Sequence, residues 1–397
     1  MITDRNILCI STPPWEANYA STTVQLMREL AKHNKVLFVN NPFTIKDVTD
    51  GLQRKKEVPV KKVFGLKERL KIVPLGNGRD VYVLTPPMIF SIQFLSKGFL
   101  YRSLMKLNGL LVRRSVKKYL QKLQMNQDLI QVVSFNPTIG LETGRQFNER
   151  LLLYLCYDEI EAAPHLKKHG VWQEKAFGKL ADATIVTSQG LYNRKKDLSP
   201  HCYIVKNAAD FPLFSTGFNP QIPAIKSVGF IGGIDRRLDY DLLQNLISSL
   251  PHVEFNFIGR TVMKEGEHLL RQFKNVIISG PKNVHELPSY VKDFSVGIIP
   301  FRKTEFLKTV YPLKINEYLA AGIPVVTTHF SYLDDFKPVV RIAENETEFL
   351  NFVTDEMQYD SIEKKRARQN FARQNSWEHR AEEFSNIITE LEHKTKL

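Results

Sequence analysis

The chain is poor in the residues that crosslink small secreted domains or bind structural metals. Its 397 residues include three cysteines, and Cys9, Cys156 and Cys202 lie far apart. This spacing excludes a disulfide framework and a zinc-ribbon pattern, so we expect buried thiols in a reducing compartment. The ten histidines also lack paired ligand spacing. We therefore expect no essential metal and no cofactor.

Long apolar runs are missing as well. No stretch approaches the ~20 apolar residues that cross a bilayer as a helix. The first apolar run, residues 7–10, is too short for a signal-peptide core and is typical of a first strand. We therefore expect a cytoplasmic protein.

Length and composition favour two folded domains. A single core stops growing at roughly 250–300 residues. Hydrophobic residues make up 43% of the chain and charged residues 24%, as in soluble globular proteins. The formal net charge of +13 favours anionic partners, which include nucleic acid, anionic lipid and phosphorylated substrates.

Strand-like and helix-like segments alternate in two series, separated by a proline-containing break at 211–225. This alternation predicts two doubly wound α/β domains of the Rossmann type, at residues 1–210 and 211–375. Apolar positions then recur at helical spacing after Ser376, which predicts a last helix over 376–397. The pattern alone allows this helix to pack on its own domain or to return to the first; we predict the return.

Residues 90–123 mix aromatic and basic side chains and contain no acid. Such a segment suits a surface that lies on anionic lipid, at the inner face of the cell membrane. A solvated basic helix that covers the core explains the pattern equally well.

Residues 311–326, YPLKINEYLAAGIPVV, predict a short helix at the ligand-binding edge of a sheet. Pro312 suits the first helical position, Gly322 suits the residue that ends the helix, and a buried strand follows. The free N–H groups of Leu313 and Lys314 would form a phosphate site, to which the lysine adds charge. Glu317, on the same helix face, could accept both hydroxyls of a ribose. An ordinary solvated glutamate is the alternative.

This segment resembles the PLK-x-x-EYLAAG-x-PVV stretch of the retaining GT-B glycosyltransferases of family four, and is similar to their bacterial teichuronic-acid-type members. The resemblance covers nearly the whole chain. It extends to the glycine turn at 229–235, the strand end at 257–260, the hinge-like 205–211 and the Ser-Trp start of the last helix.

The resemblance implies retaining transfer from a nucleoside-diphosphate sugar, UDP-linked before GDP-linked, bound in a cleft between the two domains. Glu317 would bind the ribose, and Leu313 and Lys314 the diphosphate. Further donor-binding residues would be Gly232, Gly233, Arg237, Arg260, Lys282, Val284 and Tyr311. Many family members carry a second glutamate eight residues before the first. This chain has Thr309 there, and Glu305 is out of register to replace it.

The first domain would bind the acceptor, a polysaccharide or a lipid-linked glycan. Trp15 and Asn18 follow the first strand, and Asp158 lies in a Tyr-Asp segment similar to that of the teichuronic-type relatives. We assign Asp158 a catalytic position with Lys314 and Glu317; a turn carboxylate is the alternative. Asp239-Tyr240-Asp241 resembles a metal motif, but aspartate is common at helix starts.

Two other functions remain open. One is a nucleotide-sugar epimerase of the same fold. The other is a non-catalytic basic protein that binds membrane or nucleic acid. We predict the transferase, with a nucleotide-sugar donor, a glycan or lipid-linked acceptor and no nucleic acid as partners.

Overall fold

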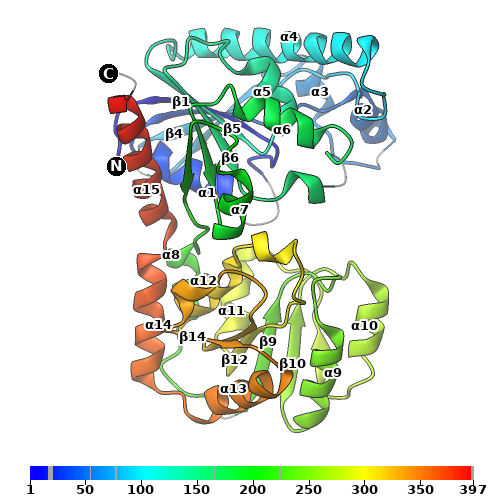
Figure 1. The fold of residues 1–397 in the computed structure, drawn as a ribbon, viewed down its shortest axis with the longest axis vertical. Coiled ribbons are helices and arrows are strands. Elements are labelled where there is room, and N and C mark those ends of the chain that lie inside the picture. The colour runs from blue at the N-terminus through cyan, green and yellow to red at the C-terminus, as the bar shows by residue number, and fades with distance from the viewer. Residues whose placement is uncertain (17–20, 54, 77, 164–165, 224, 395–397) are drawn as a thin grey trace. The chain divides into compact units, whose positions relative to one another are not determined.

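The computed structural model describes residues 1–397 except 17–20, 54, 77, 164–165, 224 and 395–397. The chain forms two compact units (Figure 1). The first contains Met1–Lys206 together with Arg380–Leu397, and the second contains Asn207–His379. No helix in the described part of the chain is long and apolar enough to span a bilayer.

The first unit is built on an eight-stranded sheet in the order β3-β4-β2-β1-β5-β6-β7-β8. Only β3 runs antiparallel to its neighbour. The strands are β1 Asn6–Ser11, β2 Lys35–Val39, β3 Leu70–Pro74, β4 Asp80–Leu84, β5 Leu129–Ser134, β6 Leu151–Cys156, β7 Ala183–Val186 and β8 His201–Ile204. The helices are α1 Thr22–Ala31, α2 Ile45–Leu52, α3 Val60–Val63, α4 Phe99–Lys122, α5 Pro137–Thr143, α6 Gly170–Gly178 and α7 Gln189–Lys195.

Both faces of this sheet are covered, which explains why its central strands are apolar at nearly every position. Ile7 and Cys9 of β1 face one apolar cluster, whereas Leu8 and Ile10 face another. The first cluster includes α1 and the last helix, α15 (Trp377–Lys394), and the second includes α4 (Figure 1). The predicted return of the last helix to the first domain is thus confirmed.

The second unit contains a six-stranded parallel sheet in the order β11-β10-β9-β12-β13-β14. Its strands are β9 Ser227–Ile231, β10 Glu254–Ile258, β11 Val276–Ile278, β12 Val296–Ile299, β13 Val325–Thr328 and β14 Val340–Ala343. Its helices are α8 Phe211–Phe214, α9 Tyr240–Ser249, α10 Lys264–Leu270, α11 Leu287–Val291, α12 Leu313–Ala320, α13 Glu346–Gln358 and α14 Ile362–Gln374. Two Rossmann-like sheets therefore replace one long sheet, as predicted.

The connection between the units differs from the expected irregular break. Asp210 caps the one-turn helix α8 by accepting a hydrogen bond from the N–H of Leu213 at 3.2 Å. Pro212 fits into this first turn because its missing N–H needs no partner there. The second unit begins at Asn207 and includes the first turn of α15, up to His379.

Candidate functional site

The strand order reverses at β9, which has β10 on one side and β12 on the other. Ligands of open α/β sheets bind outside the carboxyl ends of the strands at such a switch point. The glycine turn follows β9, and α12 is reached from the end of β12. The residues of the glycine turn and of α12 therefore meet at this edge of the second unit.

Helix α12 begins one residue later than predicted. Pro312 is the N-cap rather than the first helical residue, with extended backbone (φ −80°, ψ 99°) and no side-chain cap. The helix ends as predicted, since Gly322 adopts a φ of +77°. The N–H groups of Leu313 and Lys314 thus lie at the positive end of the helix dipole, a favourable position for an anion.

Two glycines bring the turns after β9 and β10 into contact. A Cβ atom on Gly259 would lie 2.0 Å from the carbonyl oxygen of Gly232, and both residues have a φ of +154°. The N–H of Gly232 also donates to the carbonyl of Ile258 at 2.8 Å. A side chain at Gly259 would force the two turns apart, which is the physical reason for glycine at that position.

Glu317 is a buried carboxylate, with only 5% of the residue exposed. No residue in the described part of the chain donates a hydrogen bond to its side chain. Burial raises its pKa to about 7; the charge of Lys314 opposes this rise, and Asp210 adds to it. A largely buried carboxylate to which no described residue donates is suited to a ligand that brings hydroxyl groups.

Lys314 is half-buried and is the basic residue of α12, three positions before Glu317. Burial lowers its pKa, Glu317 and Asp235 raise it, and Arg237 lowers it. The site therefore holds a desolvated cation beside a desolvated carboxylate, and both charges act more strongly than they would in water.

Arg237 is held in place by Asp235 within the same turn. Its Nη2 lies 2.6 Å from Asp235 Oδ2, its Nε lies 2.9 Å from Oδ1, and its guanidinium lies 5.4 Å from the ring centre of Phe301. Although burial raises the pKa of Asp235, the hydrogen bonds from Arg237 hold it below its ordinary value. Arg260, in contrast, is an exposed side chain at the end of β10.

Tyr311 and Thr309 lie before α12 but are packed into the protein. Tyr311 is 6% exposed, receives a hydrogen bond from Asn316 Nδ2 at 3.2 Å and has its ring centre 5.4 Å from that of Phe336. Thr309 is buried, and its hydroxyl donates to the carbonyl of Phe306 at 2.7 Å. Glu305 is exposed and pairs with Lys308. At the position where many members of the resembling family carry an extra glutamate, this chain therefore has a buried hydroxyl.

Two of the candidate donor-binding residues, Lys282 and Val284, lie in the segment after β11. Lys282 places its ammonium group 5.2 Å from the ring centre of Tyr290. The hydrogen bond with Tyr290 raises the pKa of this lysine. Val284 opens a single helical turn that Asn283 and Glu286 cap. Nothing in the described residues links Lys282 or Val284 to Glu317.

The candidate acceptor residues lie in the first unit. Asp158 follows β6, and its Oδ1 accepts the N–H of Glu159 at 2.8 Å, so it also serves as a turn carboxylate. Trp15 is 6% exposed and packs edge-on against Phe38 with ring centres 5.1 Å apart. Most of its side chain is therefore unavailable to an acceptor. Asn18 lies outside the described residues.

No group of three or more metal-ligating side chains gathers in the described part of the chain. Asp239 caps α9, accepting the N–H of Leu242 at 3.2 Å, as its place at a helix start indicated.

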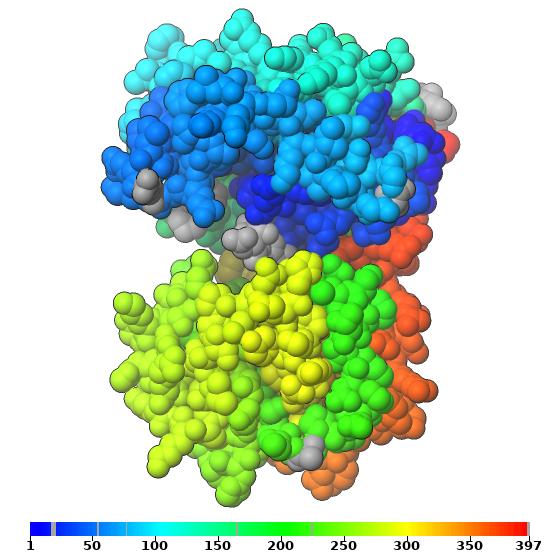
Figure 2. All heavy atoms as spheres, turned by 180° about the vertical axis from the view of Figure 1, so that it is seen from behind, coloured from blue at the N-terminus to red at the C-terminus, as the bar shows by residue number. Residues whose placement is uncertain are grey.

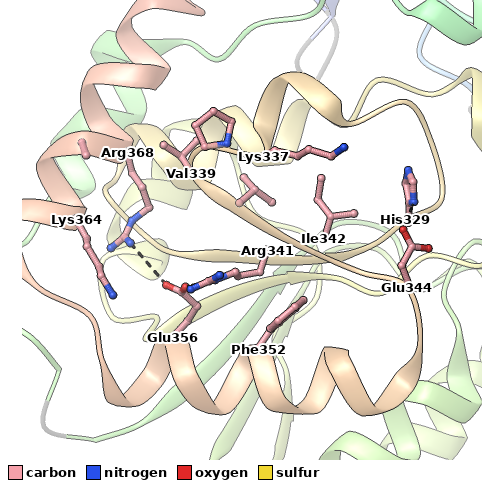
Figure 3. Close-up of a pocket in the computed structure, with 13 residues that line it drawn as sticks. His329, Lys337, Val339, Arg341, Ile342, Glu344, Phe352, Glu356, Lys364 and Arg368 are labelled. Carbon is pink, nitrogen blue, oxygen red and sulfur yellow. Dashed lines mark hydrogen bonds and ion pairs between the residues drawn. The ribbon is translucent and has the colours of Figure 1, made fainter.

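A separate hollow of about 470 Å³ lies beside the edge strand β14 (Figure 3). Its basic side chains are already engaged: Arg341 Nε lies 2.9 Å from Glu356 Oε1, and Arg368 pairs with the same carboxylate at 3.8 Å. None of the predicted site residues lines it. The candidate functional site therefore remains the one at α12.

Comparison with known proteins identifies the second unit. Residues 225–355 match the family described as Glycosyl transferases group 1. This segment is therefore similar to the group 1 glycosyltransferases. The protein named "Putative teichuronic acid biosynthesis glycosyltransferase TuaH" of Bacillus subtilis (strain 168) is 33% identical over 138 residues. That match covers 32% of this chain and 34% of the relative, so it spans about a third of the relative's length.

Solved structures resemble the second unit together with the first. Sucrose-phosphate synthase from Thermosynechococcus elongatus has a TM-score of 0.65 at 15% identity, covering 98% of this chain and 99% of that one. Starch Synthase IV from Arabidopsis thaliana has a TM-score of 0.64 at 11% identity, covering 98% and 100%. The lipopolysaccharide outer core galactosyltransferase WaaB has 0.61 at 12% identity, covering 97% and 99%. These likenesses establish the two-domain GT-B fold predicted from the sequence.

Three residues that matter to the site were not singled out in advance. Asp210 and Asp235 set the charge around Glu317 and Lys314. Tyr318 belongs to no motif with an evident chemical role, yet its hydroxyl lies against the glycine turn. Asp210 and Asp235 stand in the hinge-like and glycine-turn segments, so the sequence could have pointed to them. The contact that Tyr318 makes had no such signal in the sequence.

Proposed function

We propose that this protein is a retaining glycosyltransferase that uses a nucleoside-diphosphate sugar, UDP-linked or GDP-linked. The observation that carries the proposal is Glu317, a buried carboxylate that lacks a donor among the described residues. Two vicinal hydroxyls of a ribose supply the two donors that it lacks. The family of residues 225–355 supports the same reaction class.

The diphosphate then lies at the start of α12, one turn before Glu317. Backbone N–H groups and the Lys314 cation stabilise the negative charge that grows on the leaving diphosphate. Arg237 adds a guanidinium, which Asp235 holds in a fixed orientation. Because these groups are in place before substrate arrives, little reorganisation opposes the transition state.

We assign the acceptor to the first unit and to the class of polysaccharides or lipid-linked glycans. The support is the relative, whose name refers to teichuronic acid biosynthesis. Asp158 stands at the carboxyl end of β6, where a ligand of this sheet would bind. Its carboxylate has the chemistry to accept a hydrogen bond from an acceptor hydroxyl.

We further propose that α4 and the segment before it rest on an anionic membrane at the inner face of the cell. The body of α4 covers the core through Val112, Val116 and Leu120. Its start exposes apolar side chains: Phe99 is 88% exposed, Phe94 72% and Leu100 58%. Basic residues accompany them, and Figure 2 shows this cyan segment along one margin of the first unit. Exposed aromatics next to lysines suit a lipid interface.

The first test is thermal stabilisation by UDP, GDP, ADP, CDP and TDP, on wild type and on Glu317→Ala. A ligand that binds only the folded state raises the melting temperature. We expect one diphosphate to stabilise the wild type and not the variant. Stabilisation by no nucleotide, together with salt-dependent DNA binding, would instead favour the non-catalytic alternative.

A further inference from the structure

Tyr318 links α12 to the end of β9 through a single buried hydrogen bond. The hydroxyl of Tyr318 accepts the backbone N–H of Ile231 at 2.7 Å, across 87 positions of sequence. Tyr318 is fully buried. Ile231 is the last residue of β9, immediately before Gly232, so the contact holds the strand end from which the chain enters Gly232-Gly233.

The sheet itself leaves this N–H available. Parallel strands direct alternate N–H groups to opposite neighbours, and the N–H of Gly232 bonds to Ile258 on the β10 side. The N–H of Ile231 therefore points to the β12 side. There the ladder between β9 and β12 pairs Val228 and Gly229 and no further residue of β9. The tyrosine hydroxyl takes the place of the missing strand carbonyl.

The ring of Tyr318 is held as firmly as its hydroxyl. It lies over Gly297 of β12, where a Cβ atom would come within 2.7 Å of the ring. It also packs edge-on near Phe294, with ring centres 6.3 Å apart. The position of the hydroxyl is therefore fixed both by α12, which carries Tyr318, and by β12, against which its ring packs.

Lys314 and Tyr318 are four residues apart and share one face of α12. That face meets the glycine turn twice, through the Lys314 side chain at Gly232 and the Tyr318 hydroxyl at Ile231. Under the proposed function, these two elements approach the diphosphate from two sides. Their separation then decides whether both reach it.

We infer that the Tyr318 hydroxyl is a positioning group that sets the distance between the start of α12 and the turn at Gly232-Gly233. It thereby adapts the site to a diphosphate. The inference rests on the proposed function, in which this space holds the diphosphate of the donor. Glu317 lies on the same helix, so the ribose contact does not depend on this distance.

The test is Tyr318→Phe, which removes one oxygen and keeps the ring. Binding of UDP and of uridine is titrated by calorimetry, or of GDP and guanosine if guanine is the base selected. We expect the Kd of the diphosphate to rise about tenfold, the effect of one lost buried hydrogen bond. The Kd of the nucleoside should stay within about twofold of the wild-type value.

Tyr101→Phe is the matched control. Tyr101 is also fully buried and accepts a hydrogen bond at 2.7 Å, from Gln173 Nε2 in the first unit. It should lower the melting temperature without changing either Kd. If Tyr318→Phe is too unstable to titrate, Gly297→Ala displaces the ring while keeping the hydroxyl, and it should show the same selective loss.

The outcomes separate the two proposals. Equal weakening of diphosphate and nucleoside, or no weakening of either, overturns the positioning role while leaving the proposed function intact. A wild type that binds neither ligand overturns both.

Discussion

The side chain of Lys314 lies directly against the backbone of Gly232: a Cβ atom on that glycine would come within 2.6 Å of Lys314 Cε. The contact joins the first turn of α12 to the turn after β9. It explains why a residue without a side chain stands at the end of this strand. Because of this contact, a substitution at Gly232 would also displace the side chain of Lys314.

Gly232→Ala should displace Lys314 and weaken binding of the nucleoside diphosphate. The new methyl group takes space that the lysine chain now occupies, and the φ of +154° adds backbone strain of about 1–3 kcal/mol. Gly76→Ala is the control, because Gly76 has a φ of +80° and no neighbour within 4 Å. Calorimetric titration should show weaker binding in the first variant alone. Equal Kd values in both variants would contradict the contact.

Lys314→Met should lower activity far more than stability. The thioether keeps most of the apolar volume but cannot stabilise charge on the leaving diphosphate. Loss of one such electrostatic contact costs about 10²–10³ in kcat. Donor turnover and the melting temperature are measured on the same preparation. A loss of stability as large as the loss of transition-state stabilisation would mean that the lysine is structural.

Nucleotide binding should strengthen as pH rises through 7. Burial raises the pKa of Glu317 to about 7, so the carboxyl is largely protonated below that pH. Ribose hydroxyls donate to the ionised form and bind it best. Titrations of UDP at pH 6 and pH 8 should give the lower Kd at pH 8. A pH-independent Kd, with Glu317→Gln equal to wild type, would remove Glu317 from the site.

The same pKa predicts how the stability of the unliganded protein varies with pH. Between about 4.5 and 7 the folded state binds a proton that the unfolded state has lost, so stability falls as pH rises through this window. Glu317→Gln removes this dependence. The free energy of unfolding of this variant, relative to that of the wild type, should therefore increase by up to about 3 kcal/mol between pH 4 and pH 8. Urea unfolding at the two pH values measures the difference.

A buried ion cluster beneath Asp158 should be essential for the stability of the first unit. Lys195 Nζ lies 2.6 Å from both Glu159 and Glu174, and each of these side chains is less than 10% exposed. Lys195→Met removes the closest cation from two buried carboxylates, leaving Glu159 with Arg194 at 3.6 Å, and should cost about 3–5 kcal/mol. Lys308→Met, which breaks the exposed pair with Glu305, should cost less than about 1 kcal/mol. Chemical unfolding compares the two variants; similar costs would contradict the assignment.

Membrane binding should depend on the exposed start of α4. Phe99→Ser together with Leu100→Ser should reduce co-sedimentation with phosphatidylglycerol vesicles, since both side chains are exposed in the absence of lipid. Tyr359→Ser is the control, a 60% exposed aromatic in the second unit. Equal sedimentation of the wild type with phosphatidylglycerol and with phosphatidylcholine vesicles would argue against an anionic lipid surface.

Much of the fold follows from local patterns that the sequence alone determined. Alternating apolar runs predicted two Rossmann-like units, and the glycine at 322 marked the end of α12, because a residue without Cβ adopts positive φ at little cost. The helical spacing after Ser376 predicted α15. These features depend on preferences that act within a few residues.

Only the tertiary structure decided how the candidate site is built. The sequence left Glu317 open between solvent and ligand; its burial and its missing donors come from residues packed around it. Trp15 turned inward against Phe38, and Tyr318 reached Ile231 across 87 positions. Burial, pKa and such long-range hydrogen bonds depend on which distant segments meet, and no local preference specifies that meeting.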